Sequence, residues 1–348
     1  MPKPILHKAL AAAIFAAVLH TTATAQSLAP PHAPIVEGKP VPVVAHPQPA
    51  ALLTSKIPAL AANKKLVSDY WRNVQVAGNA NAADQYLAAG YVEHNPLLPS
   101  SLKAVKSYVA ATQKSAAVPA TVPDLVTLVA EGPYVVMARI SHYPEPDKSG
   151  NSYTSTRFDM FRIDNGRIAE HWDSALFRSG EKLTDFGADS AKPVVGTLGP
   201  AQLAMLNNAD PDLFQNKRLA FDLWRQIPDA GREEMAELYL DPTYIQHNPN
   251  AATGRAGFQE YFSHRPDAPI DVTLKQPLVA QVAEGDLVVQ VLKTERTHPD
   301  NKKSYNVPWF DMFRIAGHRI IEHWDSASKG ELPAVMQEQI EKEKARKP

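Results

Sequence analysis

The sequence predicts an α+β protein made of two tandem copies of one domain. Residues 158–175 (FDMFRIDNGRIAEHWDSA) and residues 310–327 (FDMFRIAGHRIIEHWDSA) are identical at fourteen of eighteen positions. In each copy, apolar residues recur at helical spacing in the first half and at strand spacing in the second half. Helices followed by an antiparallel sheet define an α+β domain, and duplication explains why the pattern occurs twice.

The N-terminal segment is typical of a secretory signal peptide. Lys3 and Lys8 precede an apolar run over 9–19, which is too short to span a bilayer, and Ala23 and Ala25 form a small-residue cleavage site. A short buried helix is the alternative interpretation. We expect residues 1–25 to be removed and the mature protein to be periplasmic or secreted.

Composition excludes several classes of partner and chemistry. The 348 residues have a formal net charge of −1 and include no cysteine. A charge near zero offers no electrostatic surface for nucleic acid, and the lack of cysteine excludes thiolate metal sites, thiol nucleophiles and a lipid anchor on cysteine. We therefore expect no nucleic-acid partner and no membrane association after signal cleavage.

The next segment predicts a linker, and the repeats then set the domain boundaries. Residues 26–50 contain seven prolines, which predicts a semi-extended linker over 26–60 whose part 26–50 stays disordered. The hexapeptide at 91–96 recurs at 244–249, 153 residues later, and the offset becomes 152 from Phe158 onwards. The predicted division is domain 1 over 61–190, a linker over 191–209, domain 2 over 210–330 and a helical tail over 331–348.

Within the second copy, each element has a local signal. The apolar stripe of Leu219, Leu223 and Ile227 predicts one helix, and two shorter helices are expected around 235–239 and 254–262. Strands are expected over 286–292, 309–315 and 319–324. The tail after Glu331 is expected to dock as a helix without a catalytic role.

The repeated hairpin leaves two strand registers open. A two-residue turn at Asn165–Gly166 pairs Asp159 with Trp172 and puts His171 on the other face. A three-residue loop over 164–166 pairs Asp159 with His171 and brings Asp173 to the same face. Local sequence does not choose between them.

These motifs resemble those of a known family. Tyr-x-x-His-Asn-Pro at 91–96 and 244–249, followed by Phe-Asp-Met-Phe-Arg and Glu-His-Trp-Asp, is similar to SnoaL-like proteins of the nuclear-transport-factor-2-like superfamily, which also contains ketosteroid isomerases and scytalone dehydratases. The resemblance covers 65–178 and 215–328. It implies two cone-shaped domains, each a curved antiparallel sheet wrapped around its N-terminal helices with an apolar pocket at the open end. It also implies that the two cones pair through the outer faces of their sheets as an intramolecular pseudo-dimer, with further homo-oligomers possible.

The resemblance further implies a pocket aspartate that acts as general acid/base without metal or cofactor, at Asp173 and Asp325. A carboxylate in an apolar cone has a raised pKa and is a usable proton carrier. The candidate catalytic residues are Asp173, Asp325, Asp159, Asp311, His171 and His323. The candidate substrate-binding residues are His94, Asn95, His247, Asn248, Trp172 and Trp324.

Each assignment has a structural alternative. Asp173 can pair with an arginine at the surface, Trp172 can belong to the core, and His94 can pin the loop before Pro96. Asp159, His94 and His171 together offer ligands for a metal, although no tight metal-binding spacing supports this. We expect no metal and no cofactor.

The leading functional hypothesis is an exported, cofactor-independent cyclase, isomerase or dehydratase acting on a small apolar carbonyl compound. A ligand-binding pocket or dimerisation module without activity, and a hydrolase of small molecules, are the alternatives. The copies differ at two positions of interest, since Glu93 becomes Gln246 and Arg157 becomes Trp309. If only one copy is active, we favour the second.

Overall fold

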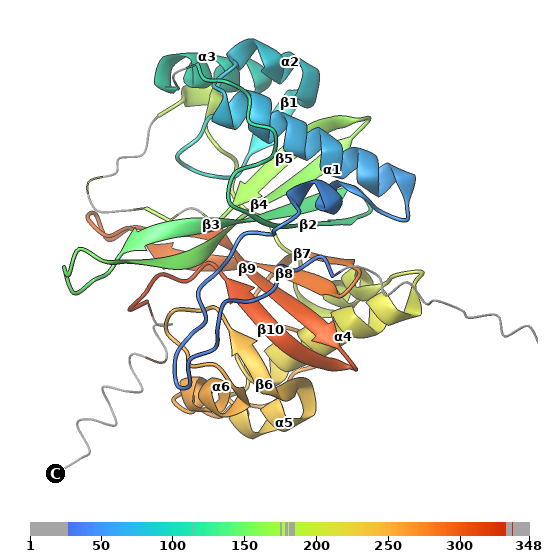
Figure 1. Ribbon diagram of the computed structural model, residues 1–348, viewed down its shortest axis with the longest axis vertical. Coiled ribbons are helices and arrows are strands. Elements are labelled where there is room, and N and C mark those ends of the chain that lie inside the picture. The colour runs from blue at the N-terminus through green and yellow to red at the C-terminus, as the bar shows by residue number, and fades with distance from the viewer. Residues whose placement is uncertain are drawn as a thin grey trace, which may run out of the picture.

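The computed structural model describes residues 27–113, 115–174, 176–177, 180, 185–331 and 336. Two five-stranded sheets face each other in the middle of the molecule, and the helices lie at its two outer ends (Figure 1). The predicted signal peptide, and all of the predicted helical tail except Glu331 and the buried Met336, lie outside these residues. In the described part of the chain, no helix has the length and apolar character needed to cross a bilayer.

The two units have the same order of elements. The first unit contains α1 (Pro58–Tyr70), α2 (Ala83–Tyr86), β1 (Leu87–Glu93), α3 (Leu102–Thr112), β2 (Leu125–Glu131), β3 (Tyr134–Pro144), β4 (Ser152–Asp164) and β5 (Arg167–Asp173). The second contains α4 (Pro211–Gln226), α5 (Ala236–Tyr239), β6 (Leu240–Gln246), α6 (Arg255–Phe262), β7 (Leu278–Glu284), β8 (Leu287–Thr297), β9 (Ser304–Ala316) and β10 (Arg319–Asp325). Short 3₁₀ or π turns occur at Pro49–Leu53, Trp71–Val76, Ala80–Ala82, Gly187–Asp189, Gly199–Leu206 and Glu233–Met235. The helices and strands expected from the second copy are all present.

Both sheets are mixed rather than purely antiparallel. Their strand orders are β1-β5-β4-β3-β2 and β6-β10-β9-β8-β7. Four strands of each sheet pair antiparallel, as expected, but β1 and β6 run parallel to β5 and β10. The parallel pairing is possible because α3, or α6, and the three intervening strands form the long connection that it requires.

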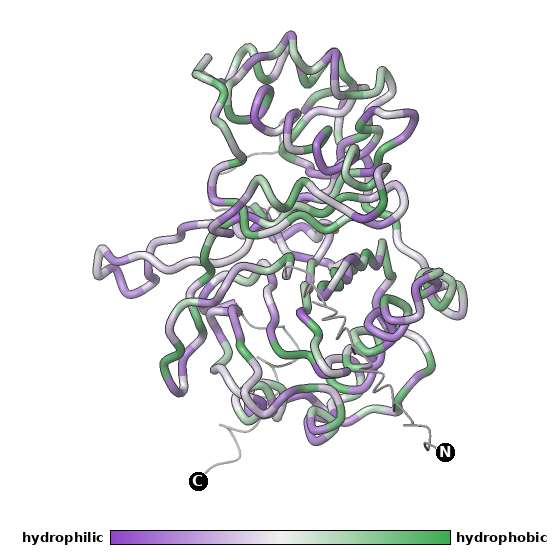
Figure 2. The backbone as a smooth tube through the Cα atoms, turned by 45° about the vertical axis from the view of Figure 1, so that its right-hand side comes forward, coloured by the Kyte–Doolittle hydropathy of each residue, from purple (hydrophilic) through white to green (hydrophobic). Residues whose placement is uncertain are grey.

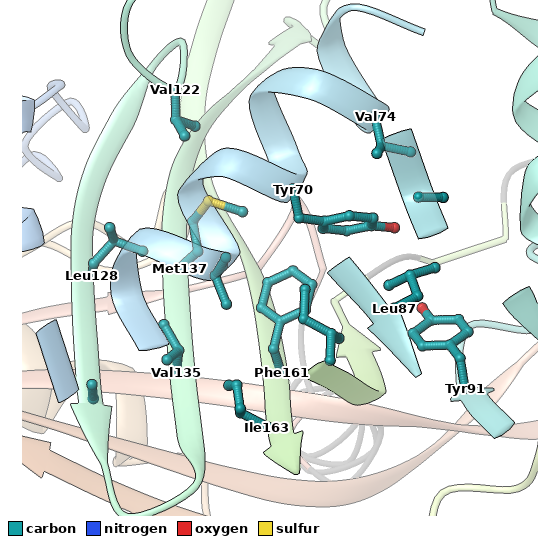
Figure 3. Packing of buried hydrophobic residues seen from close by; sticks show 14 of the residues in the cluster. Tyr70, Val74, Leu87, Tyr91, Val122, Leu128, Val135, Met137, Phe161 and Ile163 are labelled. Atoms are coloured by element: carbon teal, nitrogen blue, oxygen red, sulfur yellow. The ribbon is translucent and has the colours of Figure 1, made fainter. Parts of the chain in front are cut away.

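Each sheet packs its inner face on the helices of its own unit. Figure 3 shows the first such core, where Tyr70 at the end of α1 meets Phe161 of β4 edge to face, with ring centroids 6.1 Å apart. The second core has α4 in the corresponding place, started by Asp210, whose side chain accepts hydrogen bonds from the backbone N–H groups of Asp212 and Leu213. Along the strands in the middle of the molecule the chain is largely hydrophobic (Figure 2).

The outer faces of the two sheets pack against each other. Phe158 and Phe310 stack across this interface with ring centroids 5.3 Å apart, and Trp172 and Trp324 belong to the same apolar cluster. Face-to-face packing of two sheets is a common way to bury such faces. The predicted intramolecular pseudo-dimer is therefore confirmed.

Two buried ion pairs join the units reciprocally. Lys64 Nζ lies 2.6 Å from a Glu284 oxygen, and Lys217 Nζ lies 2.8 Å from a Glu131 oxygen. Both lysine side chains are almost fully buried, and each glutamate also accepts a backbone N–H of the opposite unit. The pairs therefore hold the two units in one relative arrangement.

The proline-rich segment is not the disordered linker that composition predicted. It forms an arm that crosses the second unit and returns to the first, where Val41 N–H donates to Gln246 O and His46 N–H donates to Leu125 O, both at 2.7 Å (Figure 1, blue). Lys192 and Thr197, each 151 residues later, make the equivalent bonds to Glu93 O and Leu278 O. Val41 and His46 are not prolines and so can donate. Because Lys192 and Thr197 make the equivalent bonds, the repeated unit begins near residues 39 and 190 rather than 61 and 210.

Candidate active site

The geometry of the repeated hairpin brings the predicted acids together. Each hairpin closes with a two-residue turn at positive φ, Asn165–Gly166 in the first unit and Gly317–His318 in the second. A β-bulge then leaves Ala169, or Ile321, without an opposite residue and shifts the register by one.

The shifted register settles the two alternatives that the sequence left open. Asp159 lies directly opposite Asp173, and Asp311 directly opposite Asp325. The turn has two residues, as the first alternative assumed. Asp159, His171 and Asp173 nevertheless share one face, as the second alternative, with its three-residue loop, assumed.

In the second unit, hydrogen bonds decide where the protons of the cluster lie. The Asn248 backbone N–H donates to Gln246 Oε1 at 2.9 Å, which turns the amide oxygen of Gln246 toward His323 Nδ1, 2.9 Å away. Nδ1 therefore carries a proton and donates it. His323 Nε2 lies 3.0 Å from Asp311 Oδ1, so a neutral ring accepts there, and the proton of this contact belongs to the Asp311 carboxyl group.

The pKa values agree with this assignment. Burial raises the pKa of Asp311 well above its usual range and lowers the pKa of His323. Burial also raises the pKa of Asp325 to about 6, with His323 opposing the shift and Asp311 adding to it. Asn248 Nδ2 donates to Asp325 Oδ2 at 2.6 Å and fixes the position of that carboxyl group.

The cluster faces a cavity of about 210 Å³ inside the second unit. Asp311, His323 and Asp325 lie in its lining together with Gln246 and Asn248. The aromatic residues of the lining are Trp224, Phe258, Tyr261, Phe262, Trp309 and Phe313. An apolar cavity with a few convergent polar groups is the usual form of a small-molecule site.

In the first unit, two arginines bind the corresponding carboxylates. Arg139 Nη2 lies 2.9 Å from Asp159 Oδ2, and Arg157 Nη2 lies 2.8 Å from Asp173 Oδ2. Arg139 also lies over the Trp71 ring, 4.0 Å from its centroid. Leu292 and Trp309, which face each other across β8 and β9, occupy the places of these two arginines in the second unit.

The first-unit histidine is held as an imidazolium ion. Its Nδ1 lies 3.0 Å from both oxygens of Glu93, and its Nε2 lies 3.1 Å from Asp159 Oδ1. Burial alone would lower the pKa of His171, but Glu93 and Asp159 raise it to about 10. Burial would likewise raise the pKa of Asp159, but Arg139, His171 and Arg157 together hold it below its usual range.

Four of the predicted substrate-binding residues lie elsewhere. His94 stacks on Trp172 and His247 on Trp324, with ring centroids 4.6 and 4.8 Å apart, and the two tryptophans belong to the interface between the sheets. The reason is strand alternation, since Trp324 follows His323 on β10 and points to the opposite face. His247 Nδ1 donates to Val41 O at 2.7 Å, and its Nε2 lies 2.8 Å from Glu322 Oε1, which corrects the prediction that His247 contacts substrate.

The two asparagines, by contrast, reach the acids. Asn95 Nδ2 donates to Asp173 Oδ2 at 2.9 Å, as Asn248 does to Asp325. Sequence reasoning missed Tyr261 and Arg265 of the cavity lining, and Arg139 of the first unit. Aligning β3 with β8 at the offset of 153 residues would have revealed Arg139, because it meets Leu292 there.

Each cluster also has the composition of a metal site. One ligand atom from each of Asp311, His323 and Asp325 lies within 4.8 Å of the others, and the same holds for Asp159, His171 and Asp173. Two carboxylates and an imidazole suit several divalent cations. In the first unit the arginines already neutralise the carboxylates, so the second cluster fits a cation better than the first.

A mixed sheet that closes over helices, with an acid-lined cavity inside, defines the nuclear-transport-factor-2-like class of folds. The model of the SnoaL-like domain matches residues 67–171 and 223–323, and the chain belongs to this family. Both matched ranges end at the cluster histidine, His171 or His323.

Solved structures of the same fold each match about one copy. A candidate polyketide cyclase from Acidithiobacillus ferrooxidans is 22% identical over 32% of this chain and 86% of its own, with a TM-score of 0.25. IdmH from Streptomyces antibioticus, also a candidate polyketide cyclase, is 16% identical over 32% and 89%, with a TM-score of 0.23. One from Bacillus cereus is 16% identical over 43% and 92%, with a TM-score of 0.26. Among curated proteins, none matches the chain.

Proposed function

We propose that the second unit is a cofactor-independent general acid/base enzyme for a small, largely apolar carbonyl compound, and that the first unit is its scaffold. One contrast carries the proposal. Asp311 and Asp325 lie buried in an aromatic-lined cavity without an arginine or lysine partner among the described residues, whereas Asp159 and Asp173 are ion-paired. Buried carboxyl groups with raised pKa values, placed in a cavity, are typical of proton-transfer sites.

The proposed reaction begins at Asp325. With a pKa of about 6, its carboxylate is the main form at neutral pH and takes a proton from the carbon next to the carbonyl group. The C–H electron pair moves into an enolate, whose charge collects on oxygen. Tyr261 lines the cavity, and its hydroxyl group has no hydrogen-bond partner in the described part of the chain. This hydroxyl group donates to that oxygen.

The enolate then has three outcomes, which correspond to the three reaction types. It takes a proton at another carbon in an isomerase, attacks a second carbonyl group of the same molecule in a cyclase, or expels a β-hydroxyl group in a dehydratase. In the isomerase and the cyclase Asp311 gives one proton to the substrate, since it carries one toward His323, and Asp325 then passes the proton that it took to Asp311. In the dehydratase Asp325 gives the proton that it took to the departing hydroxyl group.

Export is part of the proposal. It is supported by the two lysines, the short apolar run and the alanines at 23 and 25. The substrate would then be a molecule found in the periplasm or outside the cell.

The test measures exchange of α-protons for deuterium in a panel of ketones and lactones in D₂O, by proton NMR. Wild-type protein should accelerate exchange, and Asp325→Asn should lower the rate by about 100-fold or more while its melting temperature holds or rises. Asp173→Asn, the same change in the first unit, should keep the rate and lower the melting temperature, because it breaks the Arg157 pair.

Two results would contradict the proposal. Full exchange activity in Asp325→Asn would remove the acid/base role, and equal loss in Asp173→Asn would remove the division of roles between the units. A chelator should leave the rate unchanged. Loss of activity with chelator would assign Asp311, His323 and Asp325 to a metal instead.

A further inference from the structure

Arg265, three residues beyond the end of α6, lines the same cavity as Asp325. Its Nε is buried without a hydrogen-bond partner, and its guanidinium forms no ion pair with a carboxylate in the described part of the chain. Asp229 is near enough for its charge to act on Arg265. The Asp229 carboxylate instead accepts the Lys275 backbone N–H at 2.9 Å.

The other arginine of the lining is neutralised. Arg296 Nη1 lies 2.8 Å from Glu331 Oε1, and its guanidinium lies over the Trp309 ring, 5.0 Å from the centroid. Arg265 is therefore the cavity cation whose charge is left without a partner among the described residues.

The fold itself does not require an arginine at this place. The corresponding residue of the first unit is Thr112, at the offset of 153 residues, and its hydroxyl donates to Tyr108 O at 2.7 Å. Tyr261, by contrast, has a counterpart in Tyr108. The arginine thus occurs in the unit that has the open acid cluster, and is absent from the unit whose cluster is ion-paired.

We propose that the molecule bound in this cavity carries a carboxylate group, which Arg265 binds. A planar guanidinium group offers parallel N–H donors that match a carboxylate, and a buried donor without a partner calls for one. Trp224 supports the same conclusion, because its buried Nε1 also lacks a partner among the described residues and lines the cavity. The aromatic walls would hold the apolar body of the ligand.

This inference rests on the proposed function in one respect. It treats the molecule that carries the carboxylate as the substrate, with the separate carbonyl group of that molecule at Asp325. Tyr261 lines the same cavity, and the charges of both Asp325 and Arg265 act on it, so it lies near both ends of such a ligand. The proposed substrate class is therefore a small aromatic or apolar acid that also contains a ketone.

The test compares 1-naphthoate with 1-naphthamide, which has nearly the same shape and no charge, by titration calorimetry at pH 7. Wild-type protein should bind the carboxylate about ten-fold or more tightly, since a charge-assisted pair is stronger than a neutral one. Arg265→Gln should abolish the preference, and Arg265→Lys should restore part of it. Arg255→Gln, at the start of α6 and outside the cavity lining, should keep the preference.

The outcomes separate this inference from the proposed function. Asp325→Asn should lose proton exchange and still prefer the carboxylate, while Arg265→Gln should still exchange the α-protons of neutral ketones. No preference in wild-type protein, or an unchanged preference in Arg265→Gln, would overturn the carboxylate assignment. Tighter binding of 1-naphthyl phosphate than of 1-naphthoate would replace the carboxylate with a phosphate group.

Discussion

Replacing Gln246 by Glu should give the second unit the histidine protonation state of the first. The first unit has Glu93 at this position, in contact with His171 Nδ1, and the pKa of His171 is about 10 although burial opposes the charge. The second unit already has Asp311 at the other ring nitrogen, so of the two carboxylates that contact the ring it lacks the glutamate. Gln246→Glu therefore changes one atom of the contact and little of its shape.

The magnitude follows from the contact distance. An opposite charge in direct contact raises a histidine pKa by about one to three units, and each unit is worth about 1.4 kcal/mol. We therefore expect the imidazolium form of His323 to be stabilised by about 1.4–4 kcal/mol. His323 should then carry both ring protons at neutral pH, and Asp311 should lose its proton.

Because the folded-state pKa of His323 would rise above the unfolded value of about 6.5, the added stability should be fully present below about pH 6.5. It should be lost as the pH rises through the new folded-state pKa. Thermal unfolding at pH 6 and pH 9 measures this difference directly.

Nitrogen NMR of the histidine rings is the primary assay. In Gln246→Glu the two ring nitrogens of His323 should show the shifts of an imidazolium ion at pH 7, and α-proton exchange should fall because Asp311 has no proton to donate. Glu93→Gln is the matched control, which should lower the pKa of His171 and leave exchange unchanged. A His323 ring that still titrates below 6.5 in Gln246→Glu would refute the reasoning, since contact with a carboxylate would then not control the protonation state.

The remaining predictions concern pH, the interface and export. Proton exchange should fall as the pH drops through about 6, because the carboxylate form of Asp325 is the base. The same raised pKa predicts that the free energy of unfolding declines from about pH 4 to pH 6 and that Asp325→Asn removes this slope. Lys64→Met should destabilise the protein by about 3–5 kcal/mol in thermal unfolding, since it leaves Glu284 in the interface without its lysine. Lys65→Met, at a side chain that is 68% exposed, should change stability little. Edman sequencing of exported protein should begin directly after Ala25, and material that begins at Met1 would contradict signal cleavage.

The fold was predictable because duplication makes its signal visible twice. Helical stripes, strands and the hairpin motif recur at a nearly constant offset, and the outer-face pairing followed from the resemblance. The mixed sheet was not predictable, because the direction of β1 depends on pairing with β5, about eighty residues away in sequence. Local patterns describe which face of a strand is apolar but not which partner it joins.

The arm was predicted wrongly and the hairpin register was left open, for different physical reasons. Seven prolines lower the number of backbone donors, so composition alone predicts a linker. The remaining donors of Val41 and His46 nevertheless bond to carbonyl groups of two different units. The register depends on a bulge at Ala169, which the turn residues do not reveal. A single extra residue there moves Asp173 opposite Asp159 and so decides the geometry of the site.

The Asp, His and Asp of the candidate site could be predicted from the sequence, but the electrostatic effect of the residues around them could not. Both copies keep the same Asp, His and Asp, so the motif alone treats them as equivalent. The difference lies in their neighbours, where Arg139, Arg157 and Glu93 are replaced by Leu292, Trp309 and Gln246. Two of these replacements were visible in sequence, but their effect required knowing that all three positions face the cluster.

These three replacements change the energetic role of the same triad. In the first unit, two arginines and an imidazolium balance three carboxylates, so every buried charge has a partner and the cluster stabilises the fold. In the second unit, Asp325 and Asp311 are buried without such partners, which costs stability and raises their pKa values. A destabilised arrangement persists when the surrounding structure holds it in place. Here the reciprocal Lys–Glu pairs, and the backbone hydrogen bonds of Val41 to the second unit and of Lys192 to the first, join the second unit to the ion-paired first. The first unit therefore has a physical reason to remain in the chain even if only the second transfers protons.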